Sequence, residues 1–311
     1  MKKNKVLLIG YSNISRKRFI NVFKKLKIKY EIASLSKKYT IEGNKIDYNN
    51  YLDALRKSKA TIAYISLPNS LHYYWAKKAL NFNYHVIVDK PVSHNFSRTE
   101  SLLKLSIKKN KLLSEAIFFN YHEQFKKALN LTKDIFKVKA NFIIPYPKKN
   151  SLLLSRKFNG GVLMDMGPYI ASLHRLLIND NLIIKDNLIK KTLSIKKNSK
   201  NLPISIKFNL DFKNIKYEGL FEFGNNYVNN LKIFTKKKII ELNRIFSPPS
   251  DENLFVRISY KNNLKILKIN KDDCFENYFK EILKNIKLNN FTFYVSSILA
   301  DNRFKKFLFN Q

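Results

Sequence analysis

Three consecutive residues that follow a short apolar run carry side chains able to do chemistry: Asp89, Lys90 and Pro91. The run before them, residues 84–88, is rich in β-branched residues and predicts a strand that the proline ends. Open α/β sheets bind their ligands in the crevice outside the carboxyl ends of their strands. The order of these residues therefore predicts an acid and an ammonium group at the ligand-binding edge of a sheet.

A second cluster lies within residues 160–169. Gly167 followed by Pro168 predicts that a helix begins there, because proline suits the first helical turn. Asp165 and Tyr169 would then flank the helix N-terminus, whose positive dipole end favours anionic forms. A tyrosine beside a lysine can exchange a proton with a substrate hydroxyl or carbonyl. The alternative interpretation is a buried tyrosine beside a capping aspartate.

Residues 10–15 join the predicted first strand to the first helix, where dinucleotide folds carry G-x-G-x-x-G. Only Gly10 of the three glycines is present, and Ser12 and Ser15 take the other two places. The helix N-terminus still offers N–H groups to a phosphate, although an ordinary serine-capped turn would look the same. The predicted cofactor-binding residues of this turn are Gly10, Ser12, Asn13 and Ile14.

The end of the second predicted strand, residues 33–38, contains no acid to bind a ribose 2′-hydroxyl. Its hydroxyls and lysines, Ser36 and Lys37 among them, suit a 2′-phosphate, which favours NADP over NAD; a lysine-rich surface loop is the alternative. Beyond the third long strand, a proline and polar residues would shape the loop on the nicotinamide side. The further predicted cofactor-binding residues are Pro68, Asn69, His72, Asp89 and Lys90.

The elements that must position these residues fall into two patterns. Strands and helices alternate over residues 1–120, which predicts βαβ units in a parallel sheet. The second half carries consecutive strand signals, which are typical of an antiparallel sheet; these lie at residues 135–145, 204–212, 217–223, 231–235, 238–242 and 264–269. Residues 196–201 are predicted to form an exposed loop, and helices are predicted near residues 274–286 and 295–308.

The predicted fold class is therefore α/β, with an N-terminal doubly wound parallel sheet of the Rossmann type. Residues 1–120 would form the dinucleotide-binding domain. Residues 121–311 would form an α/β domain for substrate binding and dimerisation, built on an open and mostly antiparallel sheet. A C-terminal helix could pack back on the Rossmann domain.

The charge of the chain invites a nucleic-acid interpretation, which the distribution of basic residues opposes. The formal net charge is +36, but only nine of the 59 basic residues are arginine, and the lysines are spread along all 311 residues. Base and phosphate recognition usually relies on arginine forks. We therefore expect no nucleic-acid partner, although the electrostatic field of the net positive charge should attract small anionic partners at low salt.

Cysteine usage and hydropathy limit the classes of protein to which the chain can belong. Cys274 is the single cysteine, which excludes an intrachain disulfide and a multi-thiolate metal site, and no histidines have metal-ligand spacing. No apolar stretch of about 18 residues is present, so we expect no membrane association. The apolar run 5–9 stops at Gly10, too early for a signal peptide. A cytoplasmic protein without a metal site is predicted.

With these motifs in order, the chain resembles the glucose–fructose oxidoreductase / inositol dehydrogenase (Gfo/Idh/MocA-like) family. Residues 10–18 are similar to its G-Y-G-S-I-G-R-R-H turn, with two glycines replaced by serine, and residues 89–91 to its E-K-P motif, with aspartate for glutamate. Residues 115–124 resemble its E-A-x-x-x-R/N-x-x-x-Q segment. Residues 160–169 match G-G-x-L-x-D-x-G-x-H/Y, and Tyr169 is typical of the family's tyrosine-type branch.

The resemblance implies an NAD(P)-dependent oxidoreductase that acts on a hydroxyl or carbonyl of a sugar, sugar nucleotide or cyclitol. By that resemblance Lys90 would orient the substrate oxygen, Tyr169 would donate or accept the proton, and Asp165 would position substrate or tyrosine. The open sheet commonly makes the dimer contact in the family, so a homodimer or higher homo-oligomer is expected. A non-catalytic relative that serves as a binding or regulatory module is the alternative, because the glycine turn is degenerate.

Overall fold

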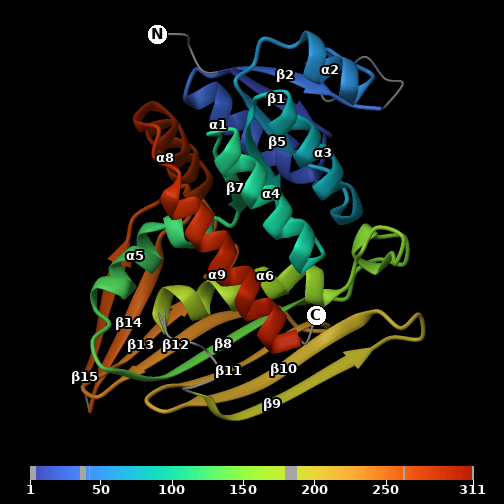
Figure 1. Cartoon of the computed structure of the whole chain (residues 1–311). Coiled ribbons are helices and arrows are strands. Elements are labelled where there is room, and N and C mark those ends of the chain that lie inside the picture. Colours follow the sequence, from blue (N-terminus) through green and yellow to red (C-terminus); the bar gives the residue numbers. More distant parts are fainter. Residues whose placement is uncertain (1–4, 36–39, 42, 179–187, 262, 310–311) are drawn as a thin grey trace. The chain divides into compact units, whose positions relative to one another are not determined.

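The structure is a computed structural model that describes residues 5–35, 40–41, 43–178, 188–261 and 263–309. The chain divides into two compact units. The first contains Met1–Ala116 and Tyr278–Leu299, and the second contains Ile117–Asn277 and Ala300–Gln311. Figure 1 labels many of the helices and strands of both units. Two C-terminal helices, α8 (Cys274–Leu288) and α9 (Thr292–Phe309), contribute residues to each unit.

The first unit is built on a five-stranded parallel sheet (Figure 1). Its strands are β1 (Lys5–Ile9), β2 (Lys29–Ala33), β5 (Ile62–Ile65), β6 (His85–Asp89) and β7 (Leu113–Ala116). Its helices are η1 (Ser15–Phe19), which is π-helical, α1 (Ile20–Lys25), α2 (Tyr51–Lys57), α3 (Asn69–Asn81) and α4 (Phe96–Lys108). A small antiparallel pair is formed by β3 (Thr40–Ile41) and β4 (Asn44–Lys45).

Both faces of this sheet are covered, which is why its strands read as continuous apolar runs. On one face, Ala76 of α3 and Leu102 of α4 join Ile65 in a fully buried core. On the other face, the ring of Phe19 lies 4.4 Å from the ring of Tyr64, measured between centroids. The unit thus consists of a sheet between two helical layers, as the alternating pattern predicts.

The strand order β2-β1-β5-β6-β7 contains a switch point between β1 and β5. The chain passes from β1 to β2 on one side and later to β5 on the other side, and both pairs are parallel. Ligands of doubly wound sheets bind at such a point, outside the carboxyl ends of the strands. The predicted Rossmann architecture is confirmed, and the turns that follow β1 and β5 lie at this edge.

The second unit is built on an eight-stranded mixed sheet. Its strands are β8 (Ile135–Pro145), β9 (Leu188–Lys197), β10 (Pro203–Phe212), β11 (Lys216–Gly224), β12 (Val228–Thr235), β13 (Ile239–Asn243), β14 (Leu254–Tyr260) and β15 (Asn263–Ile269). Its helices are η2 (Phe119–Tyr121), α5 (Glu123–Asn130), η3 (Leu152–Leu154) and α6 (Val162–Leu177). The strand order is β15-β14-β13-β12-β8-β11-β10-β9.

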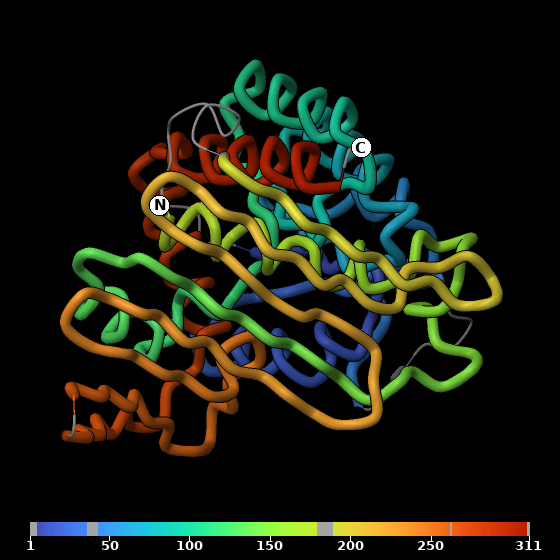
Figure 2. The backbone as a smooth tube through the Cα atoms, turned by 90° about the horizontal axis from the view of Figure 1, so that it is seen from below, coloured from blue at the N-terminus to red at the C-terminus, as the bar shows by residue number. Residues whose placement is uncertain are grey.

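All pairs in this sheet are antiparallel except β8 with β11, so the mostly antiparallel prediction is confirmed. Alternate side chains of β11 show the two faces: Tyr217, Phe221 and Phe223 are buried in the core, while the residues between them point the other way. α6 packs on the core face. In Figure 2 the strands lie nearest the viewer with α6 behind them, so the opposite face is turned forward.

Two strands of this sheet, β9 and β14, are absent from the prediction. The predicted loop 196–201 is wrong at its start, because Lys196 pairs with Ser205 within the β9–β10 ladder. Outward-facing lysines hid the strand, whereas Leu193 and Ile195 of β9 pair with core residues of β10. Pairing with a neighbouring strand overrides the polar composition of this edge.

His174 of α6 makes the stability of the second unit sensitive to acid. It is buried, its ring stacks on Phe304 with centroids 3.9 Å apart, and burial lowers its pKa from 6.5 to about 3. His85 in the first unit has its pKa lowered to about 4 by burial and by Lys111. Below pH 6.5 the unfolded chain binds protons that the folded chain excludes, so stability falls as the pH drops toward these folded-state values.

We expect the free energy of unfolding to decrease between neutral pH and about pH 5. His174→Phe should reduce that decrease, because phenylalanine keeps an aromatic ring against Phe304 and removes the titrating group. Urea unfolding at several pH values measures the free energy of unfolding of the unaltered protein and of His174→Phe. An unchanged pH dependence in His174→Phe would contradict the assignment.

Candidate active site

The turn after β1 depends on the absence of a side chain at Gly10. Gly10 has φ +92°, and a Cβ there would lie 2.2 Å from the carbonyl oxygen of Ser66. Its N–H donates to the carbonyl of Ala33 at 2.9 Å, which ties the turn to the end of β2. The backbone is therefore held close to the loop after β5, and the first glycine of the predicted motif has a structural requirement.

The two serines that replace the other glycines bond to each other and to the next loop. The Ser12 hydroxyl lies 3.2 Å from that of Ser15 and 2.6 Å from that of Ser66. The Ser15 N–H donates to the Ser12 hydroxyl at 3.3 Å, so Ser12 caps the helical segment. Asn13 and Ile14 open that segment, where backbone N–H groups have no intrahelical partner.

Asp89 ends β6 and continues this chain of hydroxyls. One carboxylate oxygen accepts from the Ser66 hydroxyl at 2.7 Å, and the other accepts from the Tyr64 hydroxyl. Burial raises the pKa of Asp89, an effect that these two hydrogen bonds, His72 and Lys90 oppose. Hydrogen bonds thus connect the turn after β1, the end of β5 and the end of β6.

Lys90 follows at the carboxyl end of β6, joined to Pro91 by a cis peptide bond. Its side chain is half-buried. The Val92 N–H donates to the carboxylate of Glu115 at 2.8 Å, and Glu115 lies at the corresponding end of β7. The structure therefore places the predicted catalytic lysine at the ligand-binding edge of the parallel sheet.

The loop after β5 leads into α3, which begins at Asn69 with Pro68 just before it. His72 lies in the first turn and is fully buried. Its Nδ1 and Nε2 atoms each lie 2.7 Å from a carbonyl oxygen, those of Pro91 and Leu67. Neither ring nitrogen is left for a cofactor, so His72 holds two loops together instead.

The predicted determinants of cofactor preference are only partly visible. β2 ends at Ala33 and is followed by buried Ser34, so the strand end contains no acid. Ser36 and Lys37 lie outside the described residues. The assignment of these two residues to a 2′-phosphate stays a prediction.

In the second unit, close contacts explain the glycine pair before α6. A Cβ at Gly160 would lie 2.5 Å from the carbonyl oxygen of Leu153, and Gly161 has φ +97° beside Pro203. The helix begins at Val162, so the prediction that it begins near Pro168 is wrong. Gly161 at the N-cap allows the earlier start.

Asp165 therefore lies in the first turn of α6, and Tyr169 lies four residues later on the same side of the helix. Both side chains are half-buried. The Tyr169 ring contacts three phenylalanine rings, with centroid distances of 6.1 Å to Phe119, 5.8 Å to Phe142 and 5.3 Å to Phe246. The aromatic contacts fix the ring of Tyr169. The positive end of the helix dipole acts on Asp165 more than on Tyr169, because Asp165 lies in the first turn.

Three buried side-chain atoms in the segment that follows Phe119 lack a hydrogen-bond partner among the described residues: Asn120 Oδ1, His122 Nε2 and Gln124 Oε1. His122 caps α5, since its Nδ1 accepts from the N–H of Gln124 at 3.1 Å. The Gln124 side-chain amide donates to carbonyls of β13 and β14. Of the three residues, Asn120 adjoins Phe119, so its oxygen is a candidate acceptor for a polar ligand.

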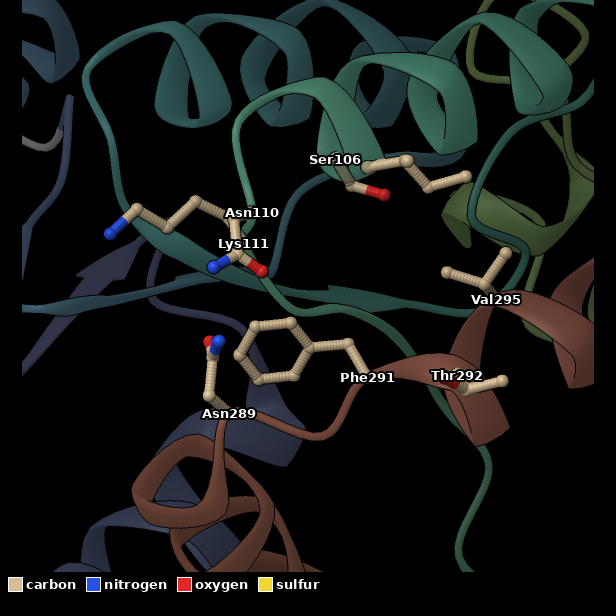
Figure 3. A pocket seen from close by; sticks show the side chains of 8 residues that line it. Ser106, Asn110, Lys111, Asn289, Phe291, Thr292 and Val295 are labelled. Carbon is tan, nitrogen blue, oxygen red and sulfur yellow. The ribbon is translucent and has the colours of Figure 1, made fainter.

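Sequence reasoning missed Ser66, Tyr64 and Glu115 as supports of the predicted site. Ser66 and Glu115 are polar residues at strand ends, which was the available signal. A cavity of about 320 Å³ in the first unit contains none of the predicted site residues. Figure 3 shows it lined by Phe291 and Val295, with Lys111, Asn110 and Asn289 nearby.

The described residues contain no group of three or more His, Cys, Asp or Glu side chains that could hold a metal ion. In the same part of the chain, no helix is long and apolar enough to cross a membrane.

Comparison with known proteins identifies similar sequences and structures. Residues 4–117 match the profile of the oxidoreductase family with an NAD-binding Rossmann fold. A dTDP-3,4-didehydro-2,6-dideoxy-α-D-glucose 3-reductase of Streptomyces violaceoruber is 29% identical over 41% of this chain and 39% of its own length. The enzyme of that name from Saccharopolyspora spinosa is 24% identical over 72% and 68%. A 3-ketoreductase from Actinomadura kijaniata, solved with NADP and TDP-benzene, has a TM-score of 0.89, 19% identity and coverage of 99% and 98%.

Proposed function

Because the chain belongs to the Gfo/Idh/MocA family of NAD-binding oxidoreductases, we propose that it transfers a hydride between NADP and a hydroxyl or carbonyl of a sugar nucleotide. The observation that carries this proposal is Lys90 at the carboxyl end of β6, directly after Asp89, whose carboxylate is hydrogen-bonded through Ser66 to Ser12 in the turn after β1. The presence of Lys90 together with Asp165 and Tyr169 favours catalysis, whereas only the degenerate glycine turn favours a binding module. The catalytic interpretation is therefore preferred to the binding module.

The residues of the first unit fit a dinucleotide. Gly10 leaves the turn without a Cβ, and the N–H groups of Asn13 and Ile14 open a helical segment beside it, an arrangement that suits a pyrophosphate. When bound, the nicotinamide would supply hydride chemistry. Pro68 and Asn69 would border it at the start of α3.

The proposed roles of the chain's own groups follow from their chemistry. The Lys90 ammonium would orient and polarise the substrate oxygen, and the Tyr169 hydroxyl would give or take the proton at that oxygen. Asp165, one helical turn before Tyr169, would position the substrate or the tyrosine. Removal of either Lys90 or Tyr169 should therefore affect the same reaction.

A nucleotide sugar is the proposed substrate class. Two relatives are named as reductases of a dTDP-linked 3-keto sugar, and a solved structural neighbour contains TDP-benzene. The diphosphate of such a substrate is anionic and suits a chain with a net charge of +36. We propose that this charge serves small anions and that nucleic acid is not a partner. The single thiol, Cys274, is buried, which is compatible with a reducing cytoplasm.

The proposed function is tested by mixing the purified protein with NADPH and dTDP-3,4-didehydro-2,6-dideoxy-α-D-glucose. We expect oxidation of NADPH that requires both the protein and the sugar nucleotide. The same sugar without its nucleotide should react much more slowly, because the diphosphate contact is lost. No oxidation with the sugar nucleotide, while NADPH binds, would reject this substrate class.

The cofactor preference gives a second prediction. NADPH should bind more tightly than NADH, because the end of β2 carries no acid to accept a ribose hydroxyl and is followed by Ser36, Lys37 and Lys38. Fluorescence titration of both nucleotides measures the two dissociation constants. Lys37→Glu should shift the ratio toward NADH, and tighter binding of NADH by the unaltered protein would reverse the assignment.

We also propose that the open face of the eight-stranded sheet forms a homodimer. On this face, Lys137 pairs with Glu218 at 3.0 Å and Lys232 with Glu241 at 2.7 Å, so part of its positive charge is offset locally despite the net charge. Leu220 adds partly buried apolar surface to the same face. Two copies could therefore approach without strong repulsion.

Light scattering at micromolar concentration should give the mass of a dimer. Leu220→Arg should lower the dimer population, because it adds an unpaired charge to this face. A monomer in the unaltered protein would count against this interface and would leave the hydride-transfer proposal untouched.

A further inference from the structure

We propose that Glu115 and His72 are positioning residues for Lys90, which they serve by fixing the backbone on its carboxyl side. The inference rests on the proposed role of Lys90 in hydride transfer. Both side chains are buried and polar, and neither has a role in the proposed chemistry.

Glu115 supplies the first attachment. It lies near the end of β7, paired with Val88 of β6, and is only 8% exposed. One of its carboxylate oxygens accepts the Val92 N–H at 2.8 Å. A carboxylate that accepts from a backbone N–H makes a charge-assisted bond, roughly twice as strong as a neutral one. The chain two residues after Lys90 is therefore bound to the neighbouring strand.

His72 supplies the second attachment. Its two ring nitrogens face the carbonyl oxygens of Pro91 and Leu67, each at 2.7 Å. Both carbonyl oxygens therefore lie within hydrogen-bonding distance of the ring. The ring thereby ties the lysine turn to the loop after β5.

Asp89, the residue before Lys90, is also held by hydrogen bonds. Asp89 accepts hydrogen bonds from the hydroxyls of Tyr64 and Ser66. Attachments on both sides therefore hold the backbone at Lys90 in place. Holding a catalytic group in its reacting geometry contributes strongly to rate, and a displacement of about 1 Å can cost about 10²-fold.

The test compares Glu115→Ala with Glu115→Gln, because glutamine keeps an oxygen that can accept the Val92 N–H. Backbone hydrogen exchange of the peptide that covers residues 89–95 should be about tenfold faster in the alanine variant and close to normal in the glutamine variant. Glu31→Ala is the matched control. Glu31 is a partly buried carboxylate of the same unit whose oxygens bond to Lys5 and Ser58. It should leave exchange of that peptide unchanged.

Turnover gives the second readout, and it is measured in the unaltered protein and in a Lys90→Ala background. Glu115→Ala should lower kcat by about tenfold to 10²-fold in the unaltered protein, with little change in cofactor affinity. In the Lys90→Ala background the same change should have almost no further effect, because no ammonium remains to be positioned. Equal losses in both backgrounds, or failure of glutamine to rescue, would overturn the positioning role.

The two readouts separate this inference from the proposed function. Faster exchange in Glu115→Ala together with an absence of turnover in the unaltered protein would retain the attachment and reject the function. Normal exchange in Glu115→Ala would overturn the inference whatever the activity. His72→Ala should also speed hydrogen exchange of residues 89–95. If this variant of a buried residue does not fold, the Glu115 variants still test the inference.

Discussion

Replacement of Tyr169 by phenylalanine should lower turnover by about 10²- to 10⁴-fold, the range for loss of a general acid or base. Cofactor affinity should stay close to normal, because the predicted cofactor-binding residues lie in another part of the chain. The fold should also persist, since phenylalanine keeps the ring that contacts Phe119, Phe142 and Phe246. Steady-state kinetics with the sugar nucleotide and NADPH titration measure the two effects.

A matched control comes from Tyr217, which lies in the same unit. Its hydroxyl donates to the carbonyl of Ile170 at 2.8 Å, and it is fully buried. Tyr217→Phe should cost about 1 kcal/mol of stability and little turnover. Near-normal turnover in Tyr169→Phe would exclude Tyr169 as the proton carrier.

Replacement of Lys90 by alanine should have a comparable effect on rate and a larger effect on substrate binding. Removal of one donor to a developing negative charge typically costs about 10²- to 10³-fold in kcat. KM for the sugar nucleotide should rise as well, because a charged contact disappears. The same kinetic assay separates the two parameters, and Lys90→Met keeps the length of the side chain without its charge.

Lys111→Ala controls for the loss of one positive charge from the same unit. Lys111 lines the cavity of Figure 3, away from the predicted site residues, and should leave kcat unaltered. If Lys90→Ala kept its turnover, the assignment of the ammonium to the substrate oxygen would be wrong.

The first unit was the more predictable part from sequence. Both faces of its sheet are covered, so the strands appear as unbroken apolar runs such as residues 5–9 and 62–65, each followed by a helix with a recognisable start. The positions of Gly10 and Lys90 at strand ends follow from that order alone. What no pattern indicated was the hydroxyl chain from Ser12 through Ser66 to Asp89, because it joins residues far apart in the sequence.

The second unit was harder to predict because its edges are polar. β9 contains two pairs of adjacent lysines, and polar residues dominated the interpretation of residues 196–201. The parallel pairing of β8 with β11 depends on which strands meet in space, which no local pattern encodes. The early start of α6 at Val162 depends on the contacts of Gly160 and Gly161, so Pro168 gave a misleading signal.

The most direct test of the central claim is transfer of deuterium from NADPH that carries deuterium at both C4 positions of the nicotinamide. The protein is incubated with this cofactor and dTDP-3,4-didehydro-2,6-dideoxy-α-D-glucose, and the product is analysed by mass spectrometry and NMR. Hydride transfer predicts one deuterium on the reduced sugar carbon of the product, and almost none with Tyr169→Phe over the same time. Cofactor that binds but transfers no deuterium to sugar nucleotides or free sugars would contradict the account.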